Sequence, residues 1–104
     1  KQYVIIHIYY NDVDKLKFNE YNKTHTGINL LKFTKVESTD KYHIHSIVIT
    51  DYNEESETYR FKNNWGPNWG YDGYGYTKLK DMNIVDIFFL ANDEITYSLI
   101  QNVA

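Results

Sequence analysis

The chain has 104 residues, enough for one small domain with a single core and too few for two. Hydrophobic residues make up 42% and charged residues 24%, which is the balance of a globular rather than a disordered chain. The net charge of -3, with no basic cluster, gives no reason to expect nucleic acid or an anionic membrane as a partner.

The sequence contains no cysteine, which excludes disulfides, thiolate metal sites and a cysteine nucleophile within this chain. No apolar run approaches the length of a membrane span, and no signal peptide is visible. The chain starts at Lys1 and enters the apolar run 4–6 almost at once. We therefore expect a piece of a longer precursor.

The first part of the chain predicts a strand and then a short helix. Residues 3–10 are rich in β-branched and aromatic side chains, which indicates a buried strand. Asn11 and Asp12 are suitable helix N-caps, and a helix is predicted over residues 13–20. Its apolar residues follow at roughly helical spacing: Val13, Leu16, Phe18 and Tyr21. Residues 28–36 are compatible with a further short strand.

The rest of the chain predicts an antiparallel sheet. Residues 42–52 have the clearest strand pattern, and the acidic stretch 53–57 is typical of a solvated hairpin loop. Two glycines and the only proline make residues 64–72 irregular. Further strands are predicted at 57–63, 74–79, 84–90 and 95–100. We expect a single domain over residues 1–104, of class α+β, mostly antiparallel β with one short helix.

Two segments carry the chemistry. The first is the strand His45-Ser46-Ile47-Val48-Ile49-Thr50-Asp51-Tyr52, and the second, within residues 61–74, fits Asn-x-Trp-Gly-x-x-Trp-Gly-x-x-Gly-Tyr at every fixed position. Together they resemble the papain family of cysteine proteases, whose catalytic histidine strand runs His-Ala-Val-x-x-Val-Gly-Tyr and precedes this loop. The resemblance covers nearly the whole chain and implies the right-hand, C-terminal lobe, a β-barrel or sheet with one short helix.

The resemblance implies a role for three residues of a Cys-His-Asn site. Such a site needs an imidazole to take the thiol proton and return it to the leaving amine, and an amide oxygen to hold the other ring nitrogen. His45 matches the catalytic histidine, Asn63 the orienting asparagine, and Trp65 the tryptophan that shields their hydrogen bond from water. The left lobe, which supplies the cysteine and a glutamine for the oxyanion, has no counterpart here.

Three further residues are implied at the substrate: Ser46, Ile44 and Trp69. Ser46 stands where the family has a small apolar residue and would border the S2 pocket. Asp51 replaces the usual glycine before Tyr52 and adds a charge near a strand end. The ending, residues 73–76, resembles most closely the mite digestive (group 1 allergen) branch.

The histidines also allow other interpretations. His43 and His45 are two apart on one strand and face the same side, so they could begin a zinc site. No third ligand is evident, and we expect no metal and no cofactor. His7 could line the same cleft, although a buried core histidine is the interpretation we favour. His25 is expected in an exposed loop.

The aromatic residues allow a carbohydrate or peptide platform as an alternative to sheet packing. The residues concerned are Trp65, Trp69, Tyr71, Tyr74 and Tyr76. For Trp69 and Tyr74 we favour packing. Asn22-Lys23-Thr24 is a glycosylation acceptor pattern, meaningful only if the chain is secreted.

Two functions remain open. The first is half of an active cysteine endopeptidase acting on peptides or proteins, and the retained His45, Asn63 and Trp65 favour it. The second is a non-catalytic, protease-derived binding or interaction module, a pseudoenzyme, which the absent cysteine favours. We expect no catalysis by this chain alone, and a left-lobe chain or a second copy across a bare face that includes the edges of these three residues. The resemblance implies a secreted or lysosomal (vacuolar) location.

Overall fold

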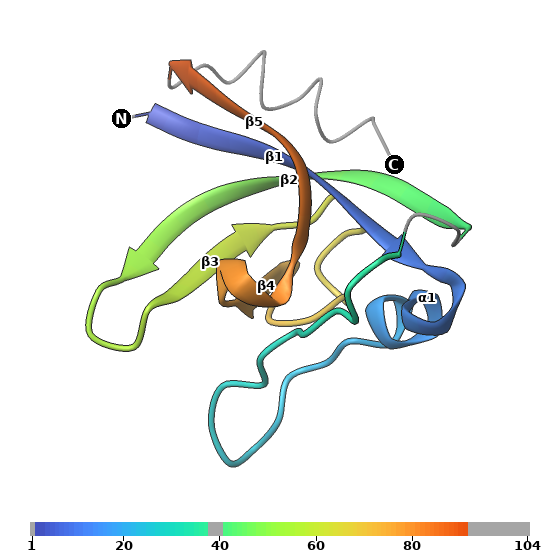
Figure 1. Ribbon diagram of the computed structural model, residues 1–104. Helices are drawn as coiled ribbons and strands as arrows, with labels where there is room; N and C mark the ends of the chain where they lie inside the picture. Colours follow the sequence, from blue (N-terminus) through green and yellow to red (C-terminus); the bar gives the residue numbers. More distant parts are fainter. Residues whose placement is uncertain (1, 38–40, 92–104) are drawn as a thin grey trace.

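The sheet is the framework of the molecule. The computed structural model describes residues 2–37 and 41–91, and within them five strands form one antiparallel sheet in the order β4-β3-β2-β1-β5 (Figure 1). The elements are β1 (Gln2–Asn11), α1 (Asp12–Asn19), β2 (Tyr42–Asn53), β3 (Thr58–Lys62), β4 (Tyr74–Thr77), the 3-10 helix η1 (Leu79–Asp81) and β5 (Asn83–Ala91). The predicted class, α+β and mostly antiparallel β with one short helix, is confirmed.

β1 and β2 form the centre of the sheet, because both are long runs of β-branched and aromatic residues that pack well on a pleated surface. Ile6 lies opposite Ile47, and Ile8 lies opposite His45. Alternate side chains of a strand face opposite sides, so these four residues share the side on which the core lies. The buried cluster comprises Ile6, Ile8, Tyr10, Phe18, Tyr21, Leu31, Phe33, Ile47, Phe61, Trp69 and Met82.

The helix α1 lies where it was predicted, and it buries a polar as well as an apolar residue. Its N-cap is Asn11, whose side chain accepts a hydrogen bond from the backbone N–H of Asp14 at 3.1 Å. Asp14 and Phe18 are buried, whereas Val13 is 79% and Leu16 62% exposed. The apolar spacing therefore predicted the helix correctly, although only Phe18 and Tyr21 of the four apolar residues are buried. Asp14 can be buried because a carboxylate with hydrogen-bond donors around it can occupy a core-facing position.

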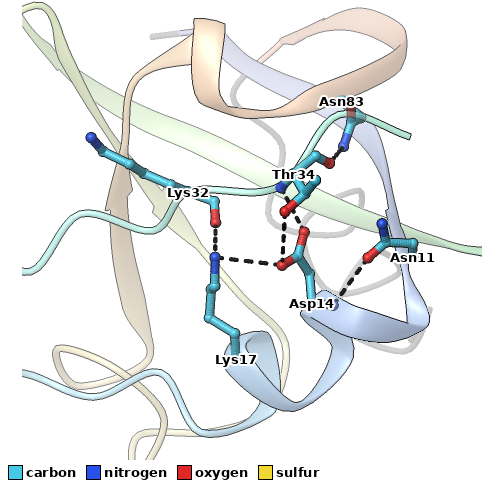
Figure 2. A network of polar contacts seen from close by, with 6 residues as sticks. All are labelled: Asn11, Asp14, Lys17, Lys32, Thr34 and Asn83. Atoms are coloured by element: carbon cyan, nitrogen blue, oxygen red, sulfur yellow. Dashed lines mark hydrogen bonds and ion pairs between the residues drawn. The ribbon is translucent and has the colours of Figure 1, made fainter. Parts of the chain in front are cut away.

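Asp14 connects α1 to the segment that precedes β2 (Figure 2). Its carboxylate accepts the backbone N–H of Thr34 at 2.6 Å and lies 3.4 Å from the ammonium of Lys17. Lys17 also donates to the backbone oxygen of Lys32 at 2.6 Å, and the side chain of Asn83 donates to the backbone oxygen of Thr34 at 2.9 Å. The segment is thus fixed between α1 and the start of β5.

The strand predicted at 28–36 is absent from the structure. Leu31 and Phe33 alternate into the core, but their N–H groups donate to separate partners, Tyr76 O and Asp81 O, each at 2.8 Å. Because no single strand runs alongside, no continuous ladder forms. The strand predicted at 74–79 ends at Thr77 and gives way to η1. The strand predicted at 95–100 lies outside the described residues.

The β2–β3 connection is a turn, as the acidic composition of 53–57 predicted.

No helix in the described ranges is long and apolar enough to cross a membrane.

Candidate active site

His45 is a buried residue on the core side of β2. Only 3% of its surface is exposed. Its ring lies 5.5 Å from that of Phe18 on α1 and 5.0 Å from that of Trp65, measured between centroids. The imidazole is therefore enclosed on two sides by aromatic rings that come from distant parts of the chain.

The side chain of Asn63 holds this imidazole. Asn63 directly follows β3 and is 1% exposed, and its Oδ1 lies 2.7 Å from Nε2 of His45. The backbone N–H of Asn64 donates to the same oxygen at 2.9 Å. A backbone N–H can only donate, so it fixes which end of the amide is the oxygen. An oxygen in turn can only accept, so Nε2 of His45 carries a hydrogen and Nδ1 keeps the lone pair in the neutral ring.

Burial decides the charge of this histidine. Desolvation lowers the pKa of His45, and the hydrogen bond to Asn63 raises it and offsets part of that effect. Burial disfavours the charged imidazolium, whereas a hydrogen-bond acceptor favours it. The net shift is downward, so at neutral pH the ring is neutral and Nδ1 can accept a proton.

The motif loop after β3 is anchored at both ends. The N–H of Asn63 donates to Gly73 O at 3.0 Å, and the N–H of Gly73 donates to Trp69 O at 2.8 Å. Gly73 has a φ of 94°, and a Cβ there would lie 2.6 Å from Nζ of Lys62. Glycine is therefore favoured here by the backbone conformation, which residues with a Cβ rarely adopt, whereas the flexible end of Lys62 can move aside.

The two tryptophans of this loop occupy different environments. Trp65 is half-buried, with its ring 4.7 Å from Phe18 and edge-on to Trp69. Trp69 is buried, packs against Phe61 and Tyr21, and donates its indole N–H to Phe18 O at 2.8 Å. Trp69 is thus a core residue with little surface to offer a substrate.

Ile44 and Ser46 lie on the opposite side of β2 from His45. Ile44 is exposed and lines a groove of about 610 Å³ together with Tyr9, Tyr42, Val36, Ile84 and Val85. Ser46 is buried and lies opposite His7 on β1. The structure therefore brings Ile44 to a surface groove and does not bring Ser46 into it.

The expected bare face is smaller than the sequence suggested. His45 and Asn63 are almost completely covered, and only Trp65 keeps a partly exposed ring. The expectation that the edges of the His–Asn pair are open to solvent is wrong, because Phe18 and Trp65 pack over the imidazole.

His43 and His7 lie beside carboxylates. Nε2 of His43 lies 2.6 Å from Oδ1 of Asp12, a pairing across 31 positions that no sequence signal indicated. The described residues contain no group of three or more side chains that could hold a metal ion. His7 is half-buried on the face away from His45, beside Asp86, so neither interpretation of it was correct. His25 is exposed, as predicted.

The acidic residue Asp51, which replaces a glycine of the family pattern, is accommodated by an ion pair. Its Oδ2 lies 3.0 Å from Nη1 of Arg60 on β3. Both side chains are partly exposed, so the extra charge is solvated as well as paired.

Comparison with known proteins identifies the family of this chain. Residues 6–89 match the model of the papain family cysteine proteases, and the chain belongs to that family. A stretch of 61 residues is 33% identical to an uncharacterized peptidase C1-like protein of Acanthamoeba polyphaga mimivirus. That match covers 56% of this chain and 19% of the viral protein, so the chain spans about a fifth of its relative.

Proposed function

We propose that this chain is the C-terminal lobe of a cysteine endopeptidase and supplies the histidine and asparagine of a Cys-His-Asn site. The observation that supports it most directly is the bond between His45 and Asn63, in which the backbone N–H of Asn64 sets the direction of the amide. A second observation concerns the free-energy cost of burying the Asn63 amide. Within the described residues, Nδ2 of Asn63 is buried without a hydrogen-bond partner. Such a group costs about 1–3 kcal/mol, which packing alone does not explain.

The chemistry follows from the tautomer. Nδ1 of His45 takes the proton from a cysteine thiol, and the thiolate attacks the peptide carbonyl. The imidazolium then gives the proton to the leaving amine, while Asn63 keeps the ring oriented and Trp65 keeps water from their bond. The thiol is absent from this chain and comes from a left lobe, so the chain alone does not hydrolyse peptides.

The substrate in this proposal is a peptide or protein bound across the junction of the lobes. The roles of Ile44 and Ser46 at the substrate rest on the family resemblance, since both lie on the side of β2 opposite His45, Ile44 at a groove and Ser46 buried. Trp69 acts indirectly, because it fixes the loop that carries Asn63 and Trp65. The partner is the left lobe, on the same or another chain, with a second copy as the alternative.

The alternative function is a non-catalytic, protease-derived interaction module. The single observation in its favour is that the chain contains no cysteine. A secreted or lysosomal location, and the mite digestive branch suggested by residues 73–76, belong to the proposal and rest on resemblance.

The test is reconstitution. The chain is combined with a papain-family left lobe that carries its cysteine, and cleavage of a fluorogenic peptide is measured with an epoxide active-site titrant. We expect no titrant-sensitive cleavage by the chain alone and turnover by the pair. In the pair, His45→Ala abolishes turnover, Asn63→Ala weakens it less, and the matched control His43→Ala retains it. Full activity of the His45→Ala pair contradicts the proposal.

A further inference from the structure

A second groove lies near the turn between β2 and β3. Its volume is about 380 Å³, within the size range of ligand sites in proteins. Asp51, one of its lining residues, follows His45 by six positions on β2, roughly 20 Å along an extended strand. The groove is therefore separate from the residues that the proposed chemistry uses.

The floor of this groove is apolar and accessible. Ile28, in the loop after α1, is 53% exposed, and Tyr52, near the end of β2, is 50% exposed. Leu30 and Tyr76 complete the apolar lining. Exposed apolar side chains that gather in a hollow, rather than being scattered singly, are typical of surfaces that bind a partner.

Carboxylates gather beside the groove, on the turn between β2 and β3, rather than in its lining. Asp51 and Arg60 line it but neutralise each other in an ion pair of 3.0 Å. The turn between β2 and β3 adds three exposed carboxylates: Glu54, Glu55 and Glu57. Glu57 also lines a separate and smaller hollow that shares Tyr52, together with the basic residues Lys78 and Lys80.

The carboxylates of this turn affect the pKa of the Tyr52 phenol. Desolvation is the largest cause that raises this pKa. The neighbouring Tyr59 and the carboxylates of Glu57 and Glu54 raise it further. The ring of Tyr52 also lies 4.4 Å from that of Tyr59, measured between centroids, which holds it in place. An apolar surface and a set of negative charges therefore meet at one aromatic ring.

We propose that this groove docks an extended peptide segment in which a large apolar side chain is flanked by lysine or arginine. The apolar side chain covers Ile28 and Tyr52, and the cations face the glutamates of the β2–β3 turn. The site is independent of the proposed peptidase function, since it shares no residue with the His45 site. Because the charges are exposed, binding is weak and falls with ionic strength.

The test uses three fluorescein-labelled pentapeptides: Gly-Lys-Leu-Lys-Gly, the same peptide with serine for leucine, and the same with glutamate for both lysines. Binding to the 104-residue chain is followed by fluorescence anisotropy at 20 and 300 mM NaCl. We expect saturable binding only of the first peptide, with a Kd on the order of 0.1–1 mM at low salt. Amide shifts in the NMR spectrum should concentrate at residues 28–30, 51–60 and 76.

Two variants and a control locate the site. Ile28→Ser, at an exposed position, should weaken binding on the order of tenfold. The double variant Glu54→Gln/Glu57→Gln should weaken it at 20 mM NaCl and remove the salt dependence. Leu16→Ser, at an exposed apolar residue of α1, should bind as the original chain does. Equal binding of the glutamate peptide, unchanged binding by Ile28→Ser, or no saturable binding overturns the proposal, and circular dichroism verifies that each variant is folded.

Discussion

The indole N–H of Trp69 donates a hydrogen bond of 2.8 Å to the backbone oxygen of Phe18, 51 positions earlier in the chain. This contact ties the motif loop to α1. Phe18 in turn packs against Trp65 and His45. The position of the imidazole therefore depends on a helix, a central strand and a loop that meet at one phenylalanine.

Replacing Trp69 by phenylalanine tests this connection. Trp69→Phe removes the donor and leaves a small cavity, and we expect a loss of about 1–3 kcal/mol in the free energy of unfolding. The matched variant Trp65→Phe changes a half-buried ring with no such bond to Phe18 and should cost less. Urea denaturation measures both. If Trp65→Phe proves the more destabilising, the anchoring role of Trp69 is wrong.

Gly75 gives a steric prediction in the same region. A Cβ at this position would lie 2.4 Å from Cζ of Phe61 and 3.0 Å from Cη2 of Trp69. Both rings are buried and cannot withdraw, so Gly75→Ala should destabilise the protein by about 1–3 kcal/mol. The second-site change Phe61→Leu should recover part of that loss, measured as a thermodynamic coupling in thermal unfolding. Simple additivity of the two costs would contradict the proposed clash.

Sequence reasoning located the elements better than the contacts between them. β1 and β2 were predictable because they are rich in β-branched residues. A strand pattern of this kind can be recognised without knowing which other strands pair with it. The segment 28–36 does alternate, with Leu31 and Phe33 buried, but whether alternation makes a strand depends on what runs alongside. Which segment runs alongside is set by the tertiary structure and cannot be read from the local sequence.

The candidate site shows the same division. His45, Asn63 and Trp65 could be named because a fixed spacing connects them, and the structure brings them together. The enclosure of His45 by Phe18 and the pairing of His43 with Asp12 could not be predicted. The residues in each contact are far apart in the sequence, and no motif connects them. The burial of the His–Asn pair was likewise misjudged, since it depends on how α1 docks.

Asp14 provides a stability prediction that the sequence alone would not suggest. Its carboxylate is buried and accepts the N–H of Thr34, so Asp14→Ala leaves that donor without its acceptor and Lys17 with only the backbone oxygen of Lys32 (Figure 2). We expect a loss of about 2–4 kcal/mol. The matched control is Asp12→Ala, two positions earlier and exposed, where a clearly smaller loss is expected because the carboxylate is solvated. Equal effects in denaturant titrations would show that Asp14 does not hold the segment in place.

The pH dependence of stability follows from the burial of His45. Desolvation lowers its pKa in the folded protein below the ordinary value of 6.5, so at pH values between the two the unfolded chain binds a proton that the folded chain does not. This contribution to stability is present above about pH 6.5 and is lost as the pH falls below it, until the pH reaches the folded-state pKa. We expect urea midpoints to fall between pH 7.5 and 5.5. His45→Gln, which can still donate to Asn63, should flatten that slope, whereas His25→Gln, in an exposed loop, should leave it unchanged. A slope that persists in His45→Gln would assign the pH dependence to another group and contradict a neutral, buried imidazole at this position.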